Sequence, residues 1–127
     1  MLTSEELRQI VGRLLPFRNE RFTMGDDTAV TIVPKLQSGL IFIVLVDQPA
    51  EFQGIIGYDV NSGGASASLL DSTTVPAPQE GLIVTTGVLT GTTSTDDKFT
   101  ISAHTDGKLY LENRTGNTLN VHWFTMF

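Results

Sequence analysis

The hydrophobic pattern divides the chain into one short helical stretch and a longer series of β-strands. Between residues 7 and 15 the apolar side chains recur at the spacing of one helical face, namely Leu7, Ile10, Val11, Leu14 and Leu15. Thr3 and Glu6 have the spacing of a capping box, and Pro16 ends the pattern. We therefore predict an amphipathic helix over residues 3–15. Because so short a helix is marginal alone, its stripe must pack on its own domain or on a neighbouring subunit.

The pattern after residue 25 predicts strands separated by turns rich in Gly, Asp and Pro. Residues 17–25 have the composition of a polar-aromatic connector. We expect strands at 28–34, 40–47, 52–60, 66–70 and 82–89, with loops at 73–81 and 91–97. The run from Leu40 to Val46 is wholly apolar, which is typical of a buried strand.

Residues 98–127 show the clearest alternation. Asp106-Gly107 and Thr115-Gly116-Asn117 separate three predicted strands at 98–105, 108–114 and 118–127. Asp-Gly is typical of a type I′ turn, so we predict an antiparallel meander of these three strands. In the last strand Phe124 and Met126 share a face with Asn120 and His122, opposite Leu119, Val121, Trp123 and Phe127. Apolar residues on both faces predict a second layer there, either the N-terminal helix or another subunit.

These elements predict an all-β fold, an antiparallel β-sandwich of jelly-roll-like character with one short N-terminal α-helix. The length of 127 residues is that of one domain able to hold a core. We divide it into an N-terminal helix and connector, residues 1–25, serving attachment or oligomerisation, and a β-sandwich domain at 26–127.

Charge is unevenly distributed along the chain. The net charge is −6, but residues 1–25 carry +1 and residues 26–127 carry −7. The acidic body disfavours binding to nucleic acid, and no apolar run is long enough for a membrane helix. The N-terminal arginines are either a docking group or a solvated helix face: Arg8, Arg13, Arg18 and Arg21.

Catalytic and metal-binding patterns are weak. His104 and His122 lie on different predicted strands, and no G-x-S-x-G sequence supplies a nucleophile elbow. The pairs Asp26-Asp27 and Asp96-Asp97 lie in predicted loops, where calcium ligands occur but where Asp is common for local reasons. There is no cysteine, which excludes disulfides and thiolate sites. We expect no enzymatic activity, no cofactor and no metal.

Three aromatic residues offer an alternative binding function. Tyr58, Tyr110 and Trp123 could stack against a sugar on the surface of a sandwich. Aromatic residues scattered over separate strands are more often packing residues, and alternation places only Tyr110 on an outward face. A glycan receptor is therefore the alternative partner.

The C-terminal stretch resembles a group of viral proteins. Its sequence runs Thr105-Asp106-Gly107-Lys108-Leu109, then Asn113-Arg114-Thr115-Gly116, then an apolar strand. This resembles the closing strands of small β-sandwich virion proteins of tailed bacteriophages, which include capsid decoration proteins and the head domains of tail or head fibres. The resemblance is strongest over about the last 25 residues.

The resemblance implies a non-enzymatic bacteriophage structural protein located in the virion. Capsid decoration is the first expectation, and the carbohydrate- or receptor-binding head of a tail or head fibre is the alternative. The expected partners are copies of itself, in a homotrimer, and other virion proteins such as the major capsid or tail protein. The candidate interface comprises Leu7, Ile10, Val11, Leu14, Phe124 and Met126, and the candidate docking group comprises the four arginines named above.

Overall fold

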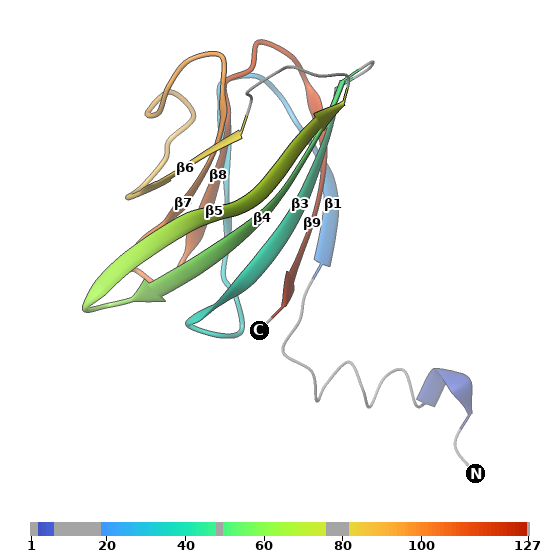
Figure 1. Cartoon of the computed structure of the whole chain (residues 1–127), viewed down its shortest axis with the longest axis vertical. Coiled ribbons are helices and arrows are strands. Elements are labelled where there is room, and N and C mark those ends of the chain that lie inside the picture. The colour runs from blue at the N-terminus through green and yellow to red at the C-terminus, as the bar shows by residue number, and fades with distance from the viewer. Residues whose placement is uncertain (1–2, 7–18, 48–49, 76–81, 127) are drawn as a thin grey trace.

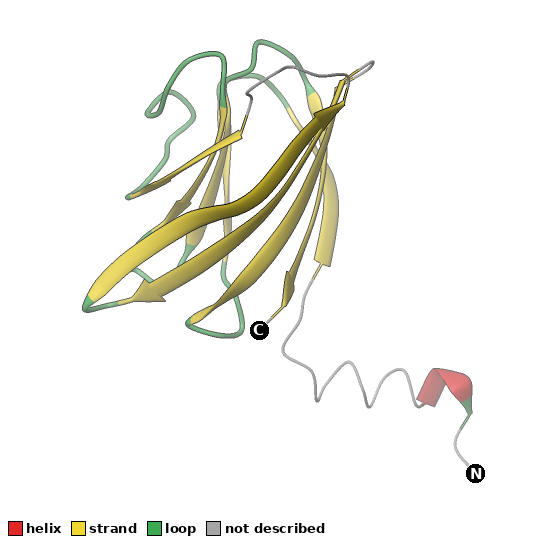
Figure 2. Ribbon diagram, in the orientation of Figure 1, coloured by secondary structure: helices red, strands yellow, loops and turns green. Residues whose placement is uncertain are grey.

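The computed structural model describes residues 3–6, 19–47, 50–75 and 82–126. Within these ranges nine strands form two sheets that pack face to face (Figures 1 and 2). One sheet has the order β1 (Asn19–Met24), β9 (Leu119–Met126), β3 (Ser38–Asp47), β4 (Ala50–Asn61), β5 (Gly64–Val75). The other has the order β2 (Thr28–Ile32), β8 (Leu109–Asn113), β7 (Phe99–Ala103), β6 (Leu82–Thr86). The prediction of an all-β sandwich is confirmed.

The predicted three-strand meander at the C-terminus is wrong. β7 and β8 do form an antiparallel pair, but β9 crosses to the other sheet and lies between β1 and β3. Both edges of β8 are already occupied, by β7 on one side and β2 on the other. β9 therefore cannot pair with β8, and it lies in the other sheet instead.

Two further differences concern the N-terminal connector and the fourth and fifth strands. Residues 19–24 of the expected connector form the edge strand β1, which pairs antiparallel with β9. Polar and charged residues dominate this strand, and only Met24 of it is fully buried, so its apolar alternation is weak. β5 is longer than expected and continues into the predicted loop as far as residue 75. The pairing of β4 with β5 shifts register between Ile55 and Ile56, which leaves Leu70 of β5 as the extra residue of a β-bulge.

The turn at Asp106-Gly107 is also not of type I′. A type I′ turn requires positive φ at both central residues, but here only Gly107 has it, at 84°. The Gly107 N–H instead donates to the carbonyl of His104 at 3.2 Å, and the His104 N–H donates to the carbonyl of Lys108 at 3.1 Å. The expected hairpin is present with a different turn geometry.

The core lies between the inner faces of the two sheets. β3, β7, β8 and β9 contribute its fully buried side chains, which include Ile41, Ile43, Leu45, Phe99, Ile101, Leu109, Leu111, Val121 and Trp123. Trp123 is the largest of them, and its Nε1–H has no hydrogen-bond partner among the described residues. Alternate residues of the strands fill this core, as the alternation in residues 98–127 predicted.

The N-terminal segment is described only at its start. Residues 4–6 form one helical turn that stands clear of the two sheets in Figure 1. The Glu6 N–H donates to Thr3 Oγ1 at 3.1 Å, and the Thr3 N–H donates to Glu6 Oε1 at 3.4 Å, which confirms the capping box. The rest of the predicted helix, 7–15, lies outside the described residues. No helix in the described part of the chain is long and apolar enough to cross a membrane.

Candidate functional site

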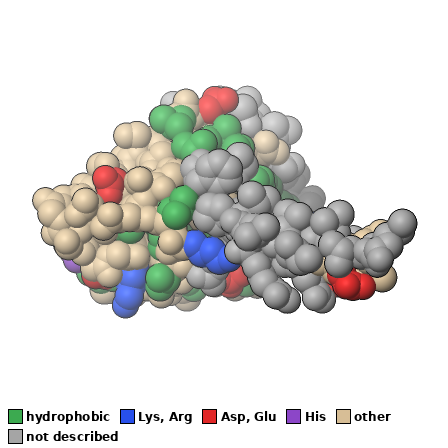
Figure 3. All heavy atoms as spheres, turned by 90° about the horizontal axis from the view of Figure 1, so that it is seen from below, with side chains coloured by type: hydrophobic (Ala, Val, Ile, Leu, Met, Phe, Trp, Pro, Cys, Tyr) green, Lys and Arg blue, Asp and Glu red, His purple; other side chains and the backbone are tan. Residues whose placement is uncertain are grey.

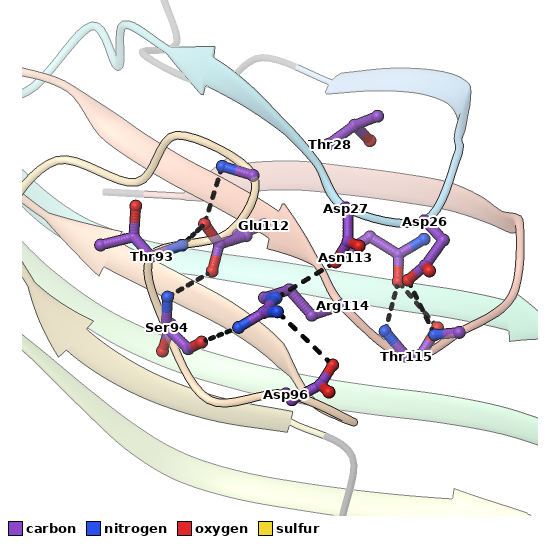
Figure 4. Close-up of polar contacts among 12 residues, drawn as sticks. Asp26, Asp27, Thr28, Thr93, Ser94, Asp96, Glu112, Asn113, Arg114 and Thr115 are labelled. Carbon is purple, nitrogen blue, oxygen red and sulfur yellow. Dashed lines mark hydrogen bonds and ion pairs between the residues drawn. The ribbon is translucent and has the colours of Figure 1, made fainter.

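The outer face of the four-stranded sheet is polar and is covered by a loop of the same chain. Glu112 lies on this face with no exposed surface. Its carboxylate accepts hydrogen bonds from three backbone N–H groups of the loop at 87–98: Gly91 at 2.8 Å, Thr93 at 3.0 Å and Ser94 at 2.8 Å (Figure 4). The loop is thus fixed over β7 and β8, and the buried carboxylate has donors for both oxygens.

The next residue, Asn113, joins the two sheets at one end of the sandwich. Its side-chain amide donates to the carbonyls of Met24 at 3.1 Å, Gly25 at 3.2 Å and Asn117 at 2.8 Å. Its side-chain oxygen accepts from the Thr115 N–H at 3.1 Å and from the Thr115 hydroxyl at 2.7 Å. The side chain has no exposed surface, so these bonds satisfy a fully buried amide.

Arg114 completes the cluster by connecting two loops. Its Nε donates to Asp27 Oδ1 at 3.1 Å, its Nη1 donates to the Ser94 carbonyl at 2.7 Å, and its Nη2 lies 3.7 Å from Asp96 (Figure 4). The bond to Asp27 is the main cause that raises the pKa of Arg114. We call Glu112, Asn113, Arg114 and their loop partners the polar junction.

The polar junction explains the sequence Asn-Arg-Thr-Gly without a ligand. One carboxylate from each Asp pair considered for calcium meets the Arg114 guanidinium, and Asp26 accepts from the Gly116 N–H at 2.8 Å. Among the described residues no group of three His, Cys, Asp or Glu side chains is placed to hold a metal ion. The motif therefore serves to hold three loops together.

The two histidines lie at opposite sides of the fold. His104 lies beside Tyr110, with ring centroids 6.4 Å apart, and the Tyr110 hydroxyl donates to Asp106. That bond, burial and the Asp106 charge raise the pKa of Tyr110. Burial pushes the pKa of Asp106 up, but the bonds from Tyr110 and the Lys108 N–H, with the charges of His104 and Lys108, outweigh it, so the net shift is downward. His122 faces outward from β9, with its ring centroid 6.1 Å from that of Phe124.

The three aromatic residues considered for sugar stacking are buried. The exposed fractions are 5% for Tyr58, 6% for Tyr110 and 0% for Trp123. Tyr58 and Trp123 point into the core, and the Tyr58 hydroxyl donates to the carbonyl of Leu36 at 3.3 Å. These residues do not form an exposed platform, so the packing interpretation is confirmed and the alternative of a sugar-stacking platform at these residues is wrong.

The outer face of the five-stranded sheet differs in kind, because it has an apolar centre bordered by polar residues. Its centre, which we call the apolar face, is formed by side chains of β3, β4 and β9 that are only half-buried: Leu40, Phe42, Val44, Val46, Ile55 and Phe124. The rings of Phe42 and Phe124 stack across neighbouring strands, with centroids 4.8 Å apart and planes 5° apart. The other face of this sheet packs on the core, so these residues contribute nothing to it.

Charged residues of opposite sign border the apolar face. On the β1 side Arg21 lies opposite His122, which in turn lies opposite Val44. A shallow hollow of about 470 Å³ lies here, its lining including Arg21, Thr23, Val44, Val46, Asn120 and His122. On the β5 side Asp59 and Asp71 face outward, the latter next to Leu70, whose exposed fraction is 59%.

Only part of the predicted interface lies on described residues. Phe124 is half-buried on the apolar face, and the exposed Arg21 lies at its margin. Met126 is the last residue of β9, opposite Leu40, and its side chain is not described. The other predicted interface and docking residues lie outside the described part of the chain: Leu7, Ile10, Val11, Leu14, Arg8, Arg13 and Arg18.

Sequence reasoning missed the contribution of β3 to this face. The apolar run Leu40–Val46 was interpreted as a strand buried on both sides, but only Ile41, Ile43 and Leu45 are in the core. The alternate residues face outward and are half-buried. In a sandwich with antiparallel sheets, an unbroken apolar run is itself a signal of an apolar outer face.

Comparison with known proteins gives little beyond the fold. No protein-family profile matches the chain, and no curated protein does. One solved structure gives a distant match to this chain, the tailspike protein of the Acinetobacter phage vB_ApiP_P1, with a TM-score of 0.47 and 9% sequence identity. The similarity covers 88% of this chain and 21% of that chain, so this chain corresponds to about a fifth of the tailspike.

Proposed function

We propose that this protein is a non-enzymatic structural module of a bacteriophage particle. Its assignment to phage rests on the resemblance of residues 105–127 to small virion proteins. Its role in assembly rests on one observation in the structure, the apolar face with its stacked Phe42 and Phe124. The partners are other copies of the chain and other virion proteins.

The apolar face supports an assembly role because of its chemistry. The outward face of a lone antiparallel sandwich normally carries polar residues, so that one face of each sheet is solvated. Here a patch that spans three strands carries aliphatic and aromatic side chains. A contiguous apolar patch bordered by polar residues is characteristic of a protein interface.

The proposal includes two alternative positions of the protein in the phage particle. As a capsid decoration protein, the module would dock through the arginine-bearing N-terminal segment, and as a fibre head it would lie at the tail or head fibre. A glycan-binding role in the second form would require groups other than Tyr58, Tyr110 and Trp123, because these are buried.

Labelling of purified particles tests the proposal. Antibodies against the purified protein should label phage particles produced from the genome that encodes it, as seen by immunogold electron microscopy. Gold on heads supports decoration, and gold on tails or fibres supports the fibre form. Absence of both label and tryptic peptides from purified particles would overturn the proposal.

A further inference from the structure

We propose that two copies of this chain stack through the outer faces of their five-stranded sheets, related by a two-fold axis that runs along the strands. The inference deepens the proposed assembly role and rests on it. It concerns a partner that the structure itself can identify, a second copy, because the face is complementary to itself.

The centre of the face supplies the apolar contact. Phe42 of β3 lies between Phe124 of β9 and Ile55 of β4, in register with both, and Leu40 and Val44 lie two residues from Phe42 on either side. Two such faces would bury one another, as the inner faces of a sandwich do at a spacing of about 10 Å. Removing this surface from water is the main driving force for stacking.

The margins of the face supply the orientation. Arg21 and His122 lie on the β1 side, whereas Asp59 and Asp71 lie on the β5 side. A two-fold axis along the strands places the β1 side of one copy over the β5 side of the other. The Arg21 of each copy then faces the acidic margin of the other copy. The same contact therefore occurs twice, as in an isologous interface.

The positions along the strands agree with this arrangement. Arg21 lies on the rung of Val44, and Asp71 lies on the rung of Phe42 and Ile55, two residues away. Two residues of a strand span about 7 Å. An arginine side chain is long enough to bridge that offset.

Shape and area also fit a second copy. The hollow beside Arg21 lies on the β1 side, whereas the exposed Leu70 protrudes at the bulge on the β5 side, so each copy offers a depression opposite the other's projection. Five strands, with β9 eight residues long, give a face of roughly 650 Å². A standard interface uses about 800 Å² per partner, so this face supplies most of a stable dimer contact.

The test measures self-association of the full-length chain. Light scattering after size exclusion should give twice the chain mass of 13.8 kDa for the wild type. Val44→Glu places a charge at the centre of the face and should weaken association by roughly 100-fold or more. Val88→Glu is the matched control, because Val88 is 47% exposed in the loop after β6 and should leave the dimer intact.

Charge exchange tests the orientation. Arg21→Glu and Asp71→Arg should each weaken association by about fivefold, and the double variant should return close to the wild-type value. Arg21, Val44 and Asp71 all face away from the core, so we expect each variant to fold. Circular dichroism of each variant checks this. Failure of the double variant to recover would overturn the two-fold orientation.

Other occupants of the face give different results. A monomeric wild type, or a trimer that Val44→Glu leaves intact, would overturn the proposal. So would a dimer that survives Val44→Glu but dissociates with Leu7→Asp and Val11→Asp, because the N-terminal segment would then be the contact. Particle labelling is independent: a stable dimer that is absent from virions overturns the phage role and leaves the interface standing.

Discussion

The two outer faces of the sandwich differ in how their side chains are covered. On the four-stranded sheet, buried polar groups such as Thr100, Ser102 and Glu112 are satisfied by a loop of the same chain: the Ser102 hydroxyl donates to the Gly87 carbonyl, and Glu112 accepts from three N–H groups. On the five-stranded sheet, outward side chains such as Phe42 and Val44 are apolar and only half-buried.

This difference separates folding from assembly. The polar junction is complete within one chain, so changing it should change the stability of the fold. The apolar face is incomplete within one chain, so changing it should change self-association more than folding. Figure 3, a view from the end of the sandwich, shows that hydrophobic side chains also reach the surface there, among charged and polar ones. The surface is therefore mixed, and it is the continuity of the apolar face over three strands that distinguishes it.

Replacement of Glu112 should have the largest effect on stability. Glu112→Leu leaves three loop N–H groups without an acceptor, that of Gly91 buried and those of Thr93 and Ser94 partly buried, and we expect the free energy of unfolding to fall by about 3–5 kcal/mol. Glu112→Gln keeps the side-chain shape and one acceptor oxygen, so the free energy of unfolding should fall by only about 1–2 kcal/mol. Urea unfolding followed by tryptophan fluorescence measures both. Equal losses for the two variants would show that packing, not hydrogen bonding, holds the loop.

Gly91 tests the same junction through the backbone. Its φ is +117°, and a Cβ there would lie 2.6 Å from the Asp27 carbonyl oxygen. Gly91→Ala therefore combines strain with a backbone clash, and we expect a loss of about 2–4 kcal/mol. Gly87 is the matched control, with φ of +110° and nothing within 4 Å of the added Cβ, so Gly87→Ala should cost about 1–2 kcal/mol. Thermal unfolding would rank them, and a reversed order would contradict this role of the close contact.

The stacked phenylalanines should behave differently from the junction. Phe42→Ala and Phe124→Ala each remove a half-buried ring, and a double-mutant cycle should give a coupling energy of about 0.5–1.5 kcal/mol. The same variants should weaken self-association more strongly than they lower stability. Urea unfolding at low protein concentration and sedimentation at high concentration separate the two effects. A larger loss of stability than of association would place these rings in the fold rather than in the interface.

Trp123 sharpens the comparison because its buried indole N–H has no partner within the described part of the chain. Its side chain is fully buried, and its Nε1–H makes no hydrogen bond to any residue that the structure describes. Trp123→Phe removes the unsatisfied donor, which should stabilise the fold, but it also leaves a smaller side chain in the core, which should destabilise it. The two effects should nearly cancel, so the free energy of unfolding should change by no more than about 1 kcal/mol. Calorimetry of the variant measures the balance. A loss of several kcal/mol would mean that packing of the indole outweighs its unsatisfied N–H.

The smallest effect on stability should come from Asp106 and Tyr110, whose contribution depends on pH. The pKa of Asp106 is lowered from its ordinary 3.8, so its contribution is complete above that pH and is lost as pH falls through the lowered value. The pKa of Tyr110 is raised from 10.0, so its contribution is complete below pH 10 and is lost as pH rises through the raised value. Asp106 is exposed, so Asp106→Asn should cost at most about 0.5 kcal/mol near pH 7 and less at pH 2. Unfolding curves at the two pH values test this, and an equal loss at both would exclude the charge as its cause.

Much of the fold could be predicted from periodicity, because alternation of apolar residues is a local property of the chain. It placed β2, β3, β4, β7, β8 and β9 to within a few residues. It failed for β1, whose edge position leaves few inward residues, and for the partner of β9, because strand pairing depends on which edges remain free.

The candidate site was less predictable than the fold. Phe124 was identified because it breaks the alternation of β9. The partners of Phe124 on β3 were hidden within an apolar run, where inward and outward residues look the same. The role of Arg114 also depends on three loops that meet only in the folded chain, so its sequence neighbours gave no sign of it.

The position of β9 between β1 and β3 has a consequence for the order of folding. The five-stranded sheet joins residues 19–24 to residues 119–124, and β2 likewise waits for β8. Such high contact order is typical of slow folding, on the scale of milliseconds to seconds. During synthesis β1 and β2 would be made long before their partners, so their edges would stay unpaired until β8 and β9 are made. Completion of both sheets thus waits for the last strands, and aggregation during production of the protein should depend most on how fast these strands are made and paired.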